Sequence, residues 1–306
     1  MNDESRIKNL SVPDGKIDVV LDTDAYNEID DQFAIAYLLR SKEKLNTKAI
    51  YAAPFFNSKS KGPRDGMEKS YDEIFKLLSL MGETVDVFRG SEEYLPNENT
   101  PIISSAAKDL AERAKSYSPE KPLYVVAIGA ITNVASAILI EPEVANNTVV
   151  VWLGGNALHF SHNREFNLKQ DIAAARVVMS SGVPFVQLPC MGVVSAFSVT
   201  RPELDSWLVG KNPLADYLAR NTIEYVEEFA KQKCWSKPIW DVTAVAWLLN
   251  DDDRFMLSRI INSPLPSYDG YYTDIPDSLP QRYVYHIKRD ELMSDLFEKI
   301  LSEDNK

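Results

Sequence analysis

Residues 16–40, KIDVVLDTDAYNEIDDQFAIAYLLR, constrain the fold of this chain more than any other stretch. The stretch opens with a largely apolar, β-branched run at 17–21, which predicts a buried parallel strand. An apolar pattern at helical spacing follows from Phe33. Since a helix follows the strand at once, the residues between them lie at the carboxyl edge of the predicted sheet. Open α/β folds bind their ligands at that edge.

Acidic side chains crowd the junction between this strand and helix. Hard divalent cations with oxygen ligands, Ca²⁺ or Mg²⁺, would offset their mutual repulsion, and no Lys or Arg inside the stretch does so. The alternative is helix capping, in which Asp meets the positive end of the helix dipole. Capping accounts for one or two of the acids, so we expect a metal site. The acids are Asp22, Asp24, Glu28, Asp30 and Asp31.

Composition limits the class of protein. The chain has 306 residues, of which 45% are hydrophobic and 25% charged, as in an ordinary soluble domain. Its formal net charge of −12 argues against nucleic acid or an anionic membrane as a partner. Two cysteines are too few for a disulfide framework, and no apolar run has signal-peptide or transmembrane length. We therefore expect reduced thiols and a cytoplasmic location.

Strand and helix patterns alternate along most of the chain, which predicts a mainly parallel open sheet flanked by helices. The predicted fold is α/β with a Rossmann-like core, in one domain over residues 1–306 with a helical excursion near 200–250. Further strands are expected at 47–53, 84–88, 123–128, 148–153, 184–188, 255–261 and 282–287. Helices are expected at 65–81, 104–117, from 133 to about 141, and at 171–181, 213–231, 242–249 and 290–301.

Polar side chains follow the later strands, at positions suited to one small polar ligand. Carboxylates and amides bind hydroxyl groups, and Ca²⁺ also accepts vicinal hydroxyls as ligands. A phosphate site would favour Lys, Arg or a Gly-rich cradle, so a sugar diol is the better interpretation. Asp241 can either cap the helix that follows it or point into the same crevice. The other candidates are Thr132, Asn133, Asn156, Glu165 and Asn167.

In several of these motifs and in their order, the chain resembles the nucleoside hydrolase family. The segment from Asp22-Thr23-Asp24 to Asp30-Asp31 is similar to the family's amino-terminal aspartate signature. Four further elements occur in the family's order and extend the resemblance over nearly the whole chain. They are Ile131-Thr132-Asn133, Gly154-Gly155-Asn156, Glu165-Phe166-Asn167 and Asp241.

The resemblance implies Ca²⁺-dependent hydrolysis of the N-glycosidic bond of ribonucleosides, with Asp30 as general base for the metal-bound water. It implies that Asp22 orders the loop. Expected partners are small ribosyl compounds and further copies of the chain, in a homodimer or homotetramer. The metal ligands would be Asp24, Asp31, Asp241 and the backbone carbonyl of Thr132. The ribose hydroxyls would contact Asn156, Glu165, Asn167 and Asp241.

Two departures from the family pattern concern the substrate. The loop between Asp24 and Asp30 is two residues longer than usual, which makes Asn27 and Glu28 candidates for extra contacts, Asn27 with the substrate. Relatives with broad specificity carry a His just before the late aspartate, where this chain has Trp240. Tryptophan there resembles the purine-specific branch, in which an indole stacks on the base.

Other aromatic residues and histidines have two interpretations. His159 or His162 could protonate the leaving base if their loop covers the site, or both could be solvated; His286 is expected to be an ordinary strand residue. Trp235 is a possible aromatic wall. Core packing is the better interpretation of Tyr225 and Phe229, which stand four apart on one predicted helix.

Two rival functions remain open. A haloacid dehalogenase-type phosphatase also uses an Asp-x-Asp at a strand end, but Tyr26 stands where that family has Thr or Val. The other rival is a non-catalytic nucleoside or sugar binder on the same fold. An assay for release of free base separates the enzyme from both.

Overall fold

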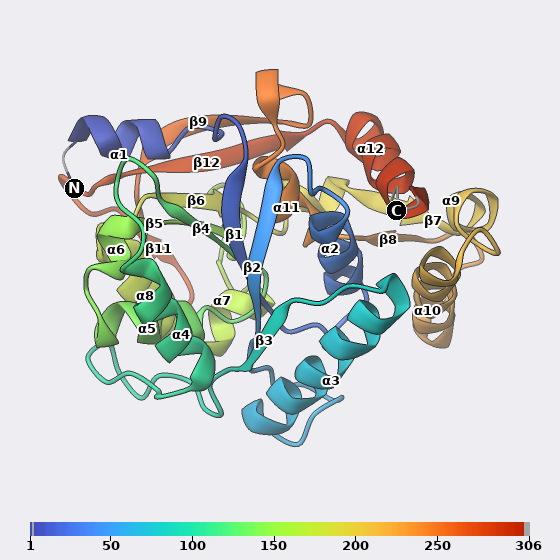
Figure 1. Ribbon diagram of the computed structural model, residues 1–306, viewed down its shortest axis with the longest axis horizontal. Coiled ribbons are helices and arrows are strands. Elements are labelled where there is room, and N and C mark those ends of the chain that lie inside the picture. The colour runs from blue at the N-terminus through green and yellow to red at the C-terminus, as the bar shows by residue number, and fades with distance from the viewer. Residues whose placement is uncertain (2, 303–306) are drawn as a thin grey trace.

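The computed structural model describes residues 1 and 3–302, which surround one eight-stranded sheet (Figure 1). The strand order is β3-β2-β1-β4-β5-β6-β12-β9, and all neighbours are parallel except β12 and β9. The first six strands have the order of a doubly wound Rossmann sheet. The predicted α/β fold with a mainly parallel open sheet is therefore confirmed. The strands are β1 (Ile17–Thr23), β2 (Leu45–Ala52), β3 (Asp86–Arg89), β4 (Leu123–Ala127), β5 (Thr148–Leu153), β6 (Phe185–Leu188), β9 (Met256–Asn262) and β12 (Pro280–Ile287).

Helices cover both faces of the sheet because its central strands are apolar on both sides. In β1, Val19 and Leu21 join one buried cluster and Val20 joins the other. The first cluster includes residues of α2 (Asp30–Leu39), α3 (Pro63–Met81), α11 (Val242–Trp247) and α12 (Arg289–Leu301). The second includes residues of α4 (Ser105–Ala114), α5 (Thr132–Ile140), α6 (Val144–Asn147) and α8 (Ile172–Ser180).

The helical excursion between β6 and α11 also contains a small sheet that the sequence did not predict. In it β7 (Ser198–Thr200) pairs antiparallel with β8 (Ser236–Pro238). Leu204 and Leu218, from the helices between these strands, are buried in the first cluster, so the excursion shares its core with the main sheet. Those helices are α9 (Arg201–Trp207) and α10 (Pro213–Phe229), and η1 (Val194–Ala196) precedes β7.

The polar loop at 159–170 was expected to be irregular, but it contains the short helix α7 (Phe166–Gln170). Glu165 starts this helix because its side chain accepts hydrogen bonds from the backbone N–H groups of Asn167 and Leu168. Other elements that the sequence analysis missed are α1 (Asp3–Asn9), η2 (Asp251–Asp253) and the hairpin of β10 (Leu265–Pro266) and β11 (Tyr272–Thr273).

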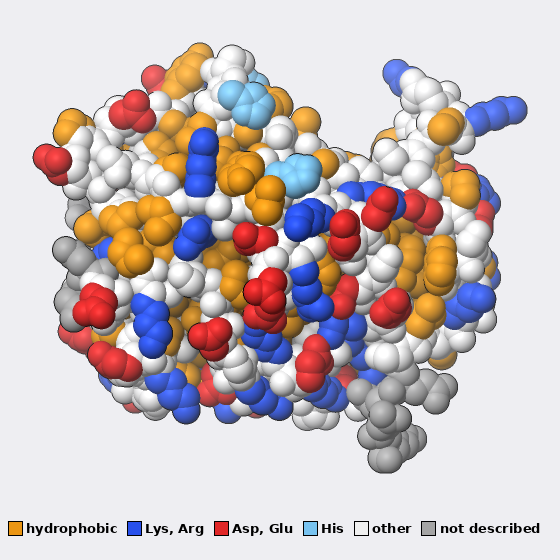
Figure 2. Space-filling view, turned by 90° about the horizontal axis from the view of Figure 1, so that it is seen from above, with side chains coloured by type: hydrophobic (Ala, Val, Ile, Leu, Met, Phe, Trp, Pro, Cys, Tyr) orange, Lys and Arg blue, Asp and Glu red, His pale blue; other side chains and the backbone are white. Residues whose placement is uncertain are grey.

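The surface drawn in Figure 2 carries Lys and Arg side chains interspersed with Asp and Glu, rather than gathered into a basic patch. Among the helices of the described residues, none is long and apolar enough to cross a membrane.

Candidate active site

The candidate site lies at the switch point of the sheet, where the chain continues outward from β1 to β2 on one side and from β4 to β5 on the other. Loops that leave neighbouring strands in opposite directions open a crevice at the carboxyl edge. A cleft of about 340 Å³ occupies this crevice. Its lining comes from the residues that follow β1, β4, β5 and β6 and from the pair before α11.

Four buried aspartates form the acidic floor of the cleft: Asp24, Asp30, Asp31 and Asp241. Carboxylate oxygens of Asp30, Asp31 and Asp241 lie within 4.8 Å of one another. Burial first, and then the neighbouring carboxylates, raise the pKa of Asp31 to about 7. The same two causes raise the pKa values of Asp24 and Asp241 well above the ordinary range. The floor therefore holds more negative charge than it can keep without a cation.

Helix capping does not account for these acids. Ile29 is the N-cap of α2, and Asp241, the N-cap of α11, makes no side-chain capping bond. Asp31 instead accepts a 2.5 Å hydrogen bond from the Thr23 hydroxyl, and Oδ2 of Asp24 is buried without a partner among the described residues. Buried, incompletely satisfied oxygen donors of this kind fit a hard divalent cation.

The grouping differs in one respect from the expected ligand set. Asp30, expected as the base, lies in the close triple, and Asp24 lies outside it but in the same cleft. Thr132 donates its hydroxyl to Asp171 at 2.7 Å, and its backbone carbonyl stays a predicted ligand. Asp22 is buried behind the floor, where it accepts a 2.8 Å bond from Asn133 Nδ2.

The three residues expected to bind the sugar, Asn156, Glu165 and Asn167, line the same cleft and are called the sugar wall. Both carboxylate oxygens of Glu165 accept backbone N–H bonds, including a 2.9 Å bond from Gly155. The Asn167 amide donates to backbone carbonyls at the ends of β4 and β5, at 3.0 and 3.1 Å. Gly155 has φ of 75°, and a Cβ there would lie 1.9 Å from the Tyr272 hydroxyl, so only glycine fits.

Glu28 and Trp240 line the side of the cleft where the base is expected, and Lys237 contacts both of them. These three residues are called the base wall. Residues 16–40 hold no cation between their ends that could offset the acids, but Lys237 does so from a distant segment. Lys237 is buried and ion-paired with Glu28, and its Nζ lies 4.0 Å from Asp30 Oδ1 and 4.0 Å from the centroid of the Trp240 ring. Burial alone would lower the pKa of Lys237, but Asp30 and Glu28 raise it. One ammonium group therefore offsets part of the charge of the floor.

Of the remaining sequence candidates, some reach the cleft and others do not. Asn27 lines it and accepts a 2.6 Å bond from Asn57. His162 is exposed and lines the cleft, whereas His159, 5.1 Å from Phe160 between ring centroids, is not among the lining residues. His286 is an exposed residue of β12, as predicted.

The aromatic residues divide in the same way. Trp240 lines the cleft, and Trp235 packs against the apolar core instead. Tyr225 is partly buried against that core. The core-packing interpretation is wrong for Phe229, which is 66% exposed at the end of α10, where the helix leaves the core.

Sequence reasoning missed several lining residues. Arg164 and Lys169 line the cleft, and so do Cys190 and Met191 after β6. The first pair could have been found, because these residues flank the Glu165–Asn167 element. Lys237 does not line the cleft itself, and its pairing with Glu28 could not have been found, because 209 residues separate the two.

The sheet is doubly wound, and its switch-point cleft combines buried aspartates with a wall of amide and carboxylate side chains, a set of groups that suits a hard cation and a ligand with hydroxyl groups. Comparison with known families then gives the narrower assignment. The model described as inosine-uridine preferring nucleoside hydrolase matches residues 19–284. The chain therefore belongs to the nucleoside hydrolase family and is an N-ribosyl hydrolase acting on small nucleoside substrates. The phosphatase and the non-catalytic binder are set aside by this result.

Individual relatives are distant and differ in specificity. The pyrimidine-specific ribonucleoside hydrolase RihA of Citrobacter koseri is 24% identical over 251 residues, 73% of this chain and 77% of that protein. The purine-preferring ribonucleoside hydrolase of Gardnerella vaginalis superimposes with a TM-score of 0.74 at 18% identity, covering 93% of this chain and 98% of that one. The plant nucleoside hydrolase PpNRh1 has a TM-score of 0.73 at 20% identity, with 95% and 100% covered.

Proposed function

We propose that this chain hydrolyses purine ribonucleosides to free base and ribose, with Ca²⁺ at the acidic floor. The observation that carries the proposal is the convergence of Asp30, Asp31 and Asp241 within 4.8 Å, directly beside the Trp240 indole. The floor supplies oxygen ligands for a hard cation, and the indole supplies an aromatic surface for a bicyclic base.

The acidic floor would hold the cation through Asp24, Asp31, Asp241 and the backbone carbonyl of Thr132. A bound Ca²⁺ would supply a ligand for the vicinal ribose hydroxyls and would lower the pKa of the attacking water. Asp30 takes the proton of that water as the general base, because it adjoins the metal ligands at the first turn of α2. Bond cleavage builds positive charge on the ribose, as in other glycoside hydrolysis, and the carboxylates stabilise it.

The sugar wall orients the ribose. Asn156, Glu165 and Asn167 accept or donate hydrogen bonds to its hydroxyls, while their own bonds to the backbone keep them in place. Asn27, from the longer loop, lies close enough in the lining to add a further contact.

Trp240 decides the preference for the departing base. Its indole can stack on a purine, whereas a pyrimidine offers less overlap and needs a proton donor more. His162 lines the cleft, and we expect it to give that proton to a pyrimidine. The two named specificities among the relatives show that the family contains both preferences.

A cytoplasmic role in nucleoside salvage completes the proposal, together with assembly as a homodimer or homotetramer. Both cysteines are free thiols, which fits a reducing compartment.

The direct test measures free base released from a panel of purine and pyrimidine nucleosides, with added Ca²⁺ and after chelation. We expect release from purines in Ca²⁺, slower release from pyrimidines, and loss of both after chelation. Full activity in chelator, or a clear pyrimidine preference, contradicts the corresponding part of the proposal.

A further inference from the structure

Two basic side chains stand on the cleft beside the sugar wall, although the chain as a whole is strongly acidic. Arg164 and Lys169 line the cleft on either side of Glu165 and Asn167. Among the described residues neither side chain forms an ion pair with a carboxylate, whereas Lys237 on the base wall pairs with Glu28. Their positive charges are therefore available to a ligand.

Arg164 is held in place by the β10–β11 hairpin. Its Nη2 donates to the backbone carbonyl of Asp269 at 3.2 Å, and a Cβ on Gly270 would lie 2.7 Å from its Nε. Gly270 has φ of 90°, which favours glycine, and the missing side chain makes room for the arginine. The Arg164 side chain is exposed, and its guanidinium rests against this turn.

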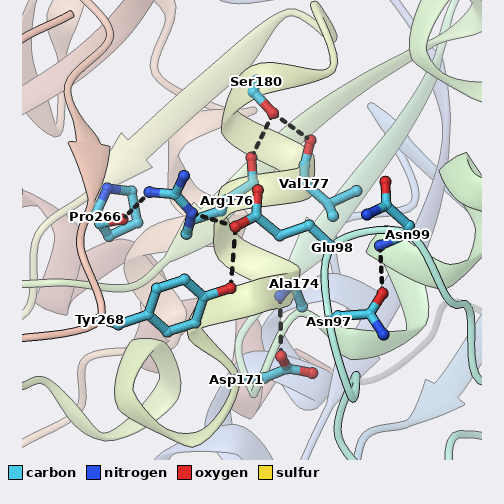
Figure 3. A network of polar contacts seen from close by, with 10 residues as sticks. All are labelled: Asn97, Glu98, Asn99, Asp171, Ala174, Arg176, Val177, Ser180, Pro266 and Tyr268. Atoms are coloured by element: carbon cyan, nitrogen blue, oxygen red, sulfur yellow. Dashed lines mark hydrogen bonds and ion pairs between the residues drawn. The ribbon is translucent and has the colours of Figure 1, made fainter.

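The hairpin is itself braced against α8. Figure 3 shows Arg176 of α8 bonded both to the Pro266 carbonyl, at 2.8 Å, and to Glu98, at 2.6 Å. Tyr268, beyond β10, donates its hydroxyl to the same Glu98 at 3.0 Å. A chain of contacts therefore runs from α8 through the hairpin to Arg164.

The direction of the ribose in the cleft follows from the floor and the base wall. If the vicinal 2′ and 3′ hydroxyls face the acidic floor and C1′ faces Trp240, the C5′ substituent lies across the ring from the base wall. In that orientation the C5′ substituent would meet the sugar wall at Asn156, with the basic pair beside it.

We propose that this basic pair, Arg164 and Lys169, is a phosphoryl subsite and that the enzyme takes ribonucleoside 5′-monophosphates. A guanidinium and an ammonium give charge-assisted hydrogen bonds to phosphate oxygens, which are stronger than neutral ones. Water would cleave the N-glycosidic bond, releasing the free base and ribose 5-phosphate with the phosphoryl group untouched. The cleft would then bind a diol at the acidic floor and the sugar wall, and a phosphate at the basic pair. The inference rests on the proposed function and extends it.

The test compares kcat/KM for a purine nucleoside and its 5′-monophosphate, in Ca²⁺ at low and high salt. We expect the wild type to favour the monophosphate by about tenfold at low salt, mainly through KM, and less at high salt. Arg164→Met should remove most of this preference, Arg164→Met with Lys169→Met nearly all of it, and Gly270→Ala part of it, because that change displaces Arg164 and keeps its charge.

Lys108→Met is the matched control, since it removes an exposed charge from α4 at a residue that does not line the cleft. It should leave the substrate ratio unchanged. A wild type that does not favour the monophosphate, or an Arg164→Met variant that keeps the wild-type ratio, overturns the subsite.

Equilibrium binding separates failure of the subsite from failure of the proposed function. If neither compound is hydrolysed but the wild type binds the monophosphate more tightly and Arg164→Met does not, the subsite stands without the reaction. If the nucleoside is hydrolysed and the 5′-phosphate weakens binding, the reaction stands and the subsite is refuted.

Discussion

The sugar wall and the base wall of the cleft are built from different kinds of contact. Glu165 and Asn167 are fixed by hydrogen bonds to the backbone at the ends of β4 and β5 and at the start of α7. The base wall depends on a buried ion pair between Lys237 and Glu28, with Trp240 beneath the ammonium group. The main sheet therefore holds one wall, and the contact between β8 and the loop after β1 holds the other.

The difference matters for the proposed function, in which the two walls recognise different parts of a nucleoside. Ribose is common to all substrates, and its wall uses backbone bonds that the sheet supplies in any case. The base varies, and its wall rests on side chains whose charges must balance. Removal of one partner from a buried pair costs more than the pair contributes. We therefore expect changes on the floor to affect all substrates and changes on the base wall to discriminate between them.

The largest effect should come from the floor, through loss of the metal. Asp31→Ala should abolish Ca²⁺ binding and activity on every nucleoside, because it removes one carboxylate of the close triple. Ca²⁺ at a hundred times its Kd should stabilise the wild type by about 2.7 kcal/mol and leave the variant unaffected. Thermal unfolding with Ca²⁺ titration and metal analysis measure this, with Glu224→Gln on α10 as control. A purified wild type without a divalent ion, yet active in chelator, would contradict it.

The next effect should be loss of the general base. Asp30→Asn should lower kcat by roughly 10²–10⁴ for purines and pyrimidines alike, with Ca²⁺ and ligand binding largely intact. Single-turnover kinetics and calorimetric Ca²⁺ binding separate the two quantities. Loss of Ca²⁺ binding in this variant would show that Asp30 is a ligand, as its place in the triple allows. Near wild-type turnover would move the search to Glu28.

Most of the fold and the acidic floor could be predicted from the sequence, because both depend on local patterns of strand, helix and acidic residues. Asp24, Asp30 and Asp31 follow one strand within eight positions, and Asp241 precedes a strongly apolar helix. The carboxyl ends of parallel strands meet at one edge of the sheet, so the proximity of these residues could be predicted from the sequence. The helix α7 was missed because its start depends on one side chain, Glu165, that was assigned to the ligand.

The base wall could not be predicted, since no local pattern connects its members. Lys237 lies on β8, a strand of three residues whose pairing with β7 has no periodic signal. Its bond to Glu28 spans 209 residues. The core-packing prediction for Phe229 was wrong for a related reason. Helical spacing predicts which residues share a face but not where a helix leaves the core.

A smaller and selective effect is expected at the aromatic side of the base wall. Trp240→Ala should lower kcat/KM for purines by about tenfold and change that for pyrimidines little, since base stacking on an indole is lost. Trp235→Ala is the control, because that indole packs against the core outside the cleft. Equal losses for both classes would mean that Trp240 only fills the wall, and the expected contrast between the two walls would then be lost.

The smallest effect should be seen in stability and should reveal how the base wall is held. Lys237→Met leaves Glu28 and Asp30 without their shared cation, and the lysine side chain is 8% exposed against 31% for Glu28. We expect a loss of about 1–3 kcal/mol in the free energy of unfolding, less than for a fully buried pair because Glu28 reaches water.

Adding Glu28→Gln to Lys237→Met removes one of the two uncompensated negative charges, so the double variant should regain part of the lost stability. Urea unfolding of the wild type, both single variants and the double variant measures a coupling energy of about 1–2 kcal/mol. The same variants, assayed on purines, should show a loss of turnover that Lys237→Arg largely restores. Additive losses of stability would mean that the two side chains act independently, and that the base wall, like the sugar wall, is held by the backbone.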